Sequence, residues 1–157
     1  METGITLLGV FCMSLVIMKI TKKEYHFALA GRIAMSTMLL LTAVAHFIFN
    51  KGMSMMLPDF IPFKAELIYL TGVLELLAAI GLLLRKFQVI TGLLLILFFI
   101  MILPSNIYAA MNHIDLQKAT YDGEGPGYLW YRIPMQLFYI AWVYFSAVKC
   151  KRTYVNS

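Results

Sequence analysis

Five polar or ionisable side chains lie inside otherwise apolar stretches of this 157-residue sequence: His46, Glu75, Asn106, Arg132 and Gln136. A carboxyl and an imidazole can exchange protons, and a guanidinium beside an amide can hold a carbonyl or carboxylate group. Such groups are costly at membrane depth, so each calls for a partner or a function. We therefore expect a polar pocket in which Glu75 and His46 are the catalytic candidates.

Helical spacing adds two residues to this candidate site. At 100° per residue, Thr71 shares a helical face with Glu75, and Tyr139 shares one with Arg132 and Gln136. Four helices would thus each contribute a polar group at a similar depth. The expected ligand-binding residues are Thr71, Asn106, Arg132, Gln136 and Tyr139.

Each candidate has a plainer interpretation that the sequence leaves open. Glu75 can be a neutral carboxyl that hydrogen-bonds to a neighbouring helix, and His46, one turn from the membrane–water interface, can be hydrated. Arg132 can extend to lipid headgroups, and Asn106 can cap backbone groups freed by Pro104. Several aromatic residues near the same interface can form an aromatic belt or stack on a ligand ring. They are Tyr69, Tyr108, Tyr128, Trp130 and Tyr131.

The composition places these side chains in a membrane protein. Of all residues 61% are hydrophobic and 13% charged, with a mean hydropathy of +0.80, which is more apolar surface than a soluble core of this length can bury. The basic residues lie at a few short junctions, a pattern that reports orientation in a bilayer. We expect the lipid bilayer as the surroundings, and no nucleic-acid partner. No metal-binding motif is present, so no metal site is expected.

Charge disappears five times for about the 20 residues that a membrane span needs, although Glu66 and Glu75 interrupt the third stretch. The first stretch lacks the basic start and small-residue cleavage site of a signal peptide, so we expect a retained helix. The period-two alternation of a membrane barrel is absent. The sequence therefore predicts an all-α integral membrane protein, a four-helix transmembrane bundle with an extra N-terminal transmembrane helix. The five spans are residues 3–18, 33–50, 65–84, 87–114 and 133–148.

Basic residues are divided unequally between the two sides of these spans. Nine lie on the side of the first connection and the C-terminus, and four lie on the other, so the first side is expected to be cytoplasmic and the N-terminus outside. His46, Asn106, Arg132 and Gln136 then fall in the outer half, with Glu75 as the floor of an outward-opening pocket. The expected units are an N-terminal transmembrane helix (1–21), a four-helix domain (30–149) and a basic cytoplasmic tail (150–157).

Five short segments, in this order, resemble the landmarks of the DoxX-like family of small integral membrane proteins. They are AVAHF (43–47), P-x-x-I-P (58–62), TGVLELLAAIGLLL (71–84), LPSNIYAAM (103–111) and YRIPMQLFYIAW (131–142). The resemblance covers residues 32–148 and implies a four-helix bundle in the bacterial cytoplasmic (inner) membrane, associated with redox processes on its outer side. The family's polar landmarks match the five residues named first. The N-terminal helix departs from the pattern.

Two functions from different classes follow from this resemblance and the pocket. The first is binding of a quinone-like lipophilic ligand, with assistance to proton-coupled redox chemistry by a protein partner in the membrane or at its outer face. In that case the chain is a subunit of a quinone-linked oxidoreductase, and any other cofactor belongs to the partner. The alternative is a non-enzymatic accessory or scaffold subunit of a larger membrane complex, and whether the chain is an enzyme stays open.

Overall fold

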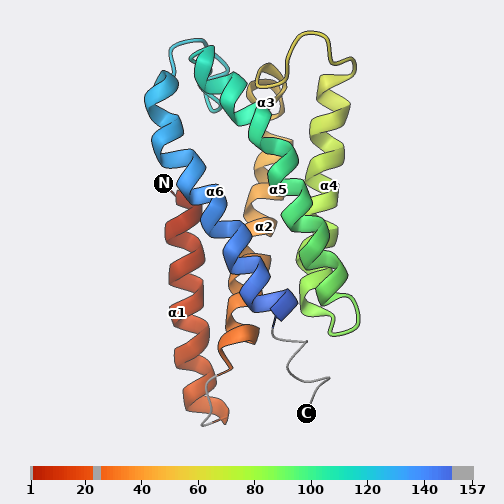
Figure 1. Ribbon diagram of the computed structural model, residues 1–157, viewed down its shortest axis with the longest axis vertical. Coiled ribbons are helices and arrows are strands. Elements are labelled where there is room, and N and C mark those ends of the chain that lie inside the picture. The colour runs from red at the N-terminus through yellow and green to blue at the C-terminus, as the bar shows by residue number, and fades with distance from the viewer. Residues whose placement is uncertain (1, 23–25, 150–157) are drawn as a thin grey trace.

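The computed structural model describes residues 2–22 and 26–149, and this part of the chain folds as helices that run alternately up and down (Figure 1). The predicted all-α fold is confirmed, because β pairing within the described residues is limited to an isolated bridge between Asp115 and Thr120. The predicted tail, 150–157, lies outside the described residues. The elements are α1 (Glu2–Lys22), α2 (Phe27–Ile48), α3 (Asn50–Met55), α4 (Lys64–Leu83), α5 (Gln88–Met111), the 3₁₀ turn η1 (Gly125–Tyr128), α6 (Leu129–Val143) and the π-helical η2 (Tyr144–Lys149).

Three helices, α2, α4 and α5, are long and apolar enough to cross a membrane. The apolar stretch of α1, Gly4–Ile20, is shorter, and α6 has 15 residues before it continues as η2. By length and composition, the chain is therefore a multi-pass membrane protein in a lipid bilayer, while the exact set of five spans stays a prediction. Outward-facing apolar side chains such as Leu77, Leu94 and Leu97 are exposed, as expected for helices that contact lipid.

The helices of the bundle end in two groups of connections (Figure 1). Residues 49–63 and 112–128 lie at one end, here called the loop end, and the tight turn between α4 and α5 lies at the other. The loop end also holds the aromatic residue Trp130, which is almost fully exposed. The polar side chains considered below are placed relative to this end.

The core joins side chains from all five long helices. Leu7, Met35, Leu39, Leu82 and Val143 are completely or almost completely buried and belong to one cluster. Burying side chains of this size removes about 1.5–3 kcal/mol of unfavourable exposure to water for each one in a soluble protein. In lipid the gain comes mainly from close packing.

Helix α1 packs against α2 and α6 but is shifted along the bundle axis relative to the other helices (Figure 1). Figure 1 shows it beginning beside the middle of α6 and extending past the end opposite to the loop end. Its Gly4 approaches Met135 so closely that a Cβ would overlap that side chain, and Phe11 lies edge-on to Trp142 at 4.9 Å between ring centroids. The start of α1 thus lies at mid-bundle rather than level with the loop end.

Candidate functional site

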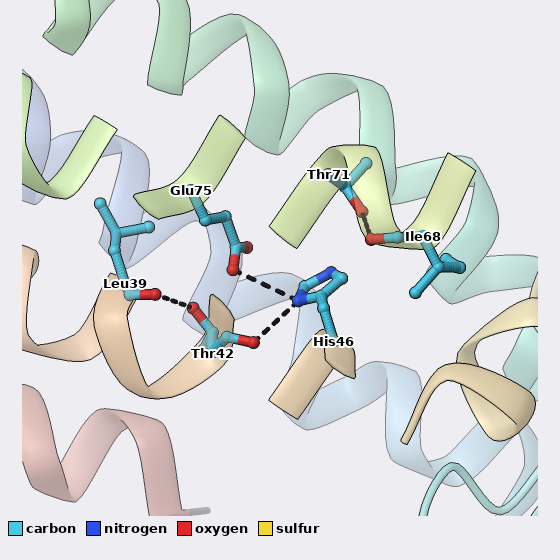
Figure 2. A network of polar contacts seen from close by, with 6 residues as sticks. All are labelled: Leu39, Thr42, His46, Ile68, Thr71 and Glu75. Atoms are coloured by element: carbon cyan, nitrogen blue, oxygen red, sulfur yellow. Dashed lines mark hydrogen bonds and ion pairs between the residues drawn. The ribbon is translucent and has the colours of Figure 1, made fainter. Parts of the chain in front are cut away.

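Glu75 of α4 and His46 of α2 face each other across the contact between these two helices (Figure 2). Nδ1 of His46 lies 3.3 Å from Oε2 of Glu75 and 2.8 Å from the carbonyl oxygen of Thr42. A carbonyl oxygen only accepts hydrogen bonds, so Nδ1 carries a hydrogen and donates it to Thr42. Oε2 of Glu75 therefore sits at ion-pair distance without a hydrogen-bond partner among the described residues, although Glu75 is only 5% exposed.

A glycine permits this close approach. A Cβ built at Gly72, one turn before Glu75, would lie 2.9 Å from Cβ of His46 and 3.3 Å from a ring carbon of Phe47. Real Cβ atoms essentially never come that close, so a side chain here would push α4 away from α2. Gly72 thus positions the His46–Glu75 pair, and only the structure singles it out.

Thr71 lies at the edge of this pair. Its hydroxyl donates a 2.7 Å hydrogen bond to the carbonyl oxygen of Ile68 in its own helix, as Figure 2 shows. Thr42 makes the same kind of bond, of 3.1 Å, to Leu39. The structure therefore brings Thr71 near the pair by helical spacing, as expected, but its hydroxyl is engaged with backbone.

A second group, here called the amide network, consists of Asn106, Tyr128, Arg132 and Gln136. Arg132 donates to the Tyr128 hydroxyl at 2.9 Å and to Oδ1 of Asn106 at 3.3 Å. Asn106 in turn donates from Nδ2 to Oε1 of Gln136 at 3.2 Å, and the Gln136 amide donates to the carbonyl of Phe99. Asn106 and Gln136 are buried, so α5 and α6 are joined by a chain of satisfied polar groups.

Two of the alternative interpretations of these residues were wrong. Asn106 does not cap backbone groups freed by Pro104: its amide bonds to side chains of α6, while Gln136 bonds to Phe99, five residues before the proline. Arg132 does not simply reach out to headgroups, because its guanidinium bonds inward and lies 5.5 Å from the Tyr128 ring centre. Both side chains are engaged by neighbours that helical periodicity alone does not reveal.

Tyr139, another predicted ligand residue, lies in aromatic packing. Its ring centre is 6.0 Å from that of Phe99 and 6.1 Å from that of Phe138. Its hydroxyl oxygen would be 3.7 Å from a Cβ at Gly4. Tyr139 of α6 therefore packs against α5 and near the start of α1.

A cavity of about 300 Å³ adjoins the amide network at the loop end. Arg132, Asn106 and Tyr128 line it from the helices, whereas Asp115 and Glu124 line it from the connection between α5 and α6. The guanidinium and amide can hydrogen-bond a carbonyl oxygen there. The two carboxylates disfavour an anionic ligand.

The expected single pocket is not what the structure contains. Within residues 2–22 and 26–149, no hydrogen bond or ion pair links the His46–Glu75 pair to the amide network, and neither His46 nor Glu75 lines this cavity. The physical reason is that the polar residues pair between neighbouring helices. Those of α2 contact those of α4, and those of α5 contact those of α6. Glu75 is consequently not the floor of the pocket that Arg132 faces.

Sequence reasoning missed a polar contact at the opposite end. Arg32, expected only to mark the end of a span, lies inside α2 and donates to Oε1 of Gln88, which is buried at the start of α5. Ser36 donates to the carbonyl of Ala79 at 2.9 Å. The one feature of the sequence that could have indicated this contact is Gln88, a polar residue next to the first residue of an apolar segment.

The fold and these buried contacts define the class, an all-helical multi-pass membrane protein with polar side chains between its helices. Residues 35–147 match the family described as Domain of unknown function (DUF8561). The match spans more than half of the chain, which therefore belongs to that family. The matched region contains both the His46–Glu75 pair and the amide network and leaves α1 outside. Comparison with curated proteins and with solved structures gives no significant match.

Proposed function

We propose that this chain is a DoxX-like protein of the bacterial inner membrane that binds a lipophilic carbonyl compound of quinone type in the cavity beside the amide network. The observation that carries the proposal is the Arg132 guanidinium, which lines the cavity with Asn106. The DoxX-like assignment rests on the five sequence segments named above, which lie between residues 43 and 142 and therefore inside the family region, 35–147.

The lining of the cavity favours a neutral carbonyl over a carboxylate. A guanidinium has five N–H donors, and two hydrogen bonds from Arg132 go to Tyr128 and Asn106, which leaves donors for a ligand oxygen. Asp115 and Glu124 would repel an anion. Apolar residues such as Ile114 complete the wall and suit a lipophilic ring.

The redox role would be shared with a protein partner. Reduction of a quinone to a quinol takes two electrons and two protons, and the electrons would come from a redox group of that partner. The His46–Glu75 pair is suited to proton exchange, because Oε2 of Glu75 has no hydrogen-bond partner in the described chain and the His46 side chain is 15% exposed. We place the pair in a proton-exchanging role and Arg132 in a ligand-binding one. Because neither His46 nor Glu75 lines the cavity, a proton from the pair would have to reach the quinone through water.

The proposed topology has five spans with the N-terminus outside. The alternating course of α2, α4, α5 and α6 supports the separation of basic residues into nine on one side and four on the other. The loop end would then face away from the cytoplasm. Single cysteines placed in residues 112–125 should react with a membrane-impermeant maleimide added to intact cells; labelling only after lysis would reverse the orientation.

Quinone binding can be tested on the purified protein in lipid nanodiscs. A short-chain benzoquinone should quench Trp130 at the loop end, in a Trp142→Phe background. Arg132→Gln should weaken this binding at least tenfold, because a lost hydrogen bond to a charged group is worth about 1.5–3 kcal/mol. Arg85→Gln, the same change in the turn between α4 and α5, should leave it unchanged. Equal affinities of the native protein and Arg132→Gln would refute the proposal.

The accessory role is a second candidate, and the completeness of the amide network favours it. Its buried amides are bonded within the chain, as expected if they only join α5 to α6. Purification from native membranes should then yield a stoichiometric complex. Arg132→Gln would lower the stability of the chain but spare the activity of that complex.

A further inference from the structure

A second cavity at the loop end, of about 420 Å³, differs in charge from the one beside the amide network. It lies between α3, the start of α4, the last turns of α5 and the following connection, and Ile114 lines both cavities. Lys51, Lys64, Tyr108 and Tyr121 line it. We propose that this cavity binds a phosphate group, as carried by an anionic phospholipid at the membrane interface.

Some of the donors that line this cavity are available to a ligand. Tyr108 and Tyr121 are among its lining residues, and within the described part of the chain Lys51 takes part in no ion pair. Two other polar lining residues, by contrast, are engaged with backbone: Asn50 donates to the Ala65 carbonyl at 3.0 Å, and Ser54 donates to that of Asn50 at 2.7 Å. These two fix the wall rather than bind the ligand.

The net charge of the cavity selects an anion. Its two ammonium groups face one carboxylate, that of Asp59, which lies 2.7 Å from Nζ of Lys64. The Asp59 side chain is 96% exposed, and such a surface ion pair contributes little, so a phosphate can replace it. Phosphate oxygens accept hydrogen bonds from ammonium and phenol groups together.

The surroundings of the cavity place it at the depth of lipid headgroups. Phe60 is 84% exposed and Phe63 is 76% exposed, and both lie in the short segment that leads from Asp59 to Lys64. Exposed aromatic side chains at the end of a helical bundle are typical of the membrane interface. A lipid phosphate would therefore lie level with Lys51 and Lys64. This inference uses residues outside the proposed quinone site and stands independently of it.

The test compares lipids by native mass spectrometry of the full chain released from micelles. The native protein should retain phosphatidylglycerol in preference to phosphatidylcholine. Lys51→Gln should lower the affinity for phosphatidylglycerol about fivefold, the effect of one lysine at an anionic lipid surface, and Asp59→Asn should raise it. Lys118→Gln, which removes a charge at the same end outside the cavity, should change nothing.

Two further outcomes decide the source of the phosphate and the fate of the proposal. Soluble glycerol phosphate that competes with the lipid, and loses affinity in Lys51→Gln, would support the same site with a free phosphate ester as its ligand. Equal losses in Lys51→Gln and Lys118→Gln would overturn the proposal, because they would show only a general charge effect. So would an unchanged affinity in both Lys51→Gln and Asp59→Asn.

Discussion

The His46–Glu75 pair lies between α2 and α4, whereas the amide network lies between α5 and α6, and the two differ in how fully their atoms are hydrogen-bonded. In the network, Gln136 uses both its amide nitrogen and its amide oxygen. In the pair, Nδ1 of His46 donates to Thr42, and Oε2 of Glu75 has no such partner within the described chain. Glu75, Asn106 and Gln136 are all buried, so the two groups differ in hydrogen bonding rather than in exposure.

This difference in hydrogen bonding distinguishes the amide network, which holds α5 and α6 together, from Glu75, which adds no such bond between α2 and α4 among the described residues. A satisfied network stabilises the fold by each bond it makes. A buried carboxyl oxygen without a hydrogen-bond partner costs free energy, so we infer that Glu75 contributes less to stability than the amide network does. The contact between α2 and α4 is secured by close packing at Gly72 instead. Stability measurements on paired variants can test this separation directly.

The largest expected effect is that of Gln136→Leu. This change leaves Nδ2 of Asn106 without its acceptor and removes the hydrogen bond to the carbonyl of Phe99, and we expect a loss of about 1–3 kcal/mol in the free energy of unfolding. Titration of the purified protein from mild detergent into dodecyl sulfate, followed by circular dichroism, measures it. Gln117→Leu makes the same change at an exposed residue and should have no effect. An equal loss in both variants would mean that the network contributes nothing specific.

A smaller effect is expected for Glu75→Gln. The substitution replaces a buried carboxyl, whose Oε2 accepts no hydrogen bond in the described chain, by an amide of nearly the same shape, so the free energy of unfolding should change by less than about 1 kcal/mol, in either direction. The same detergent titration applies, with Glu66→Gln in the first turn of α4 as the control. A loss of 2 kcal/mol or more would place Glu75 among the residues that hold the bundle and erase the distinction from Gln136.

The sequence was sufficient for the helices but not for their exact limits. Long, mainly apolar stretches located α2, α4 and α5, because charge is costly within a membrane span. The predicted second span began at residue 33, whereas α2 begins at Phe27. Arg32 lies within the helix because Gln88 accepts its hydrogen bond, and a partner so distant in sequence leaves no trace in local composition.

The individual residues of the candidate site were predictable, but their division into the His46–Glu75 pair and the amide network was not. Helical periodicity placed Glu75 on the face of α4 that meets His46, and it placed Arg132 and Gln136 together on the face of α6 that meets Asn106. Which polar helix faces contact each other depends on how the helices pack. The prediction from sequence therefore placed two separate groups of residues in one pocket. The cavities could not be foreseen either, because residues 112–125 close over the helix ends through turns with positive φ at His113, Ala119 and Gly125.

The smallest expected effect concerns the connection that forms the wall of the cavity beside the amide network. Asp115 accepts backbone hydrogen bonds from Lys118 at 3.0 Å and from Gln117 at 2.9 Å, and chiefly the bond from Lys118 holds its pKa below the ordinary value. A carboxyl with a lowered pKa in the folded state stabilises the fold above its unfolded pKa, about 3.9, and this contribution disappears as the pH falls through the folded value.

Hydrogen exchange can detect this effect in residues 112–125. After correction for intrinsic rates, the backbone amides of Gln117 and Lys118 should be better protected at pH 6 than at pH 3. Asp115→Asn should remove most of that difference, because an amide oxygen still accepts hydrogen bonds but carries no charge to lose. Asp59→Asn, outside this connection, should retain it. A pH difference of equal size in Asp115→Asn would assign the sensitivity to another group, and the acidic wall of the cavity would then keep its shape independently of this turn.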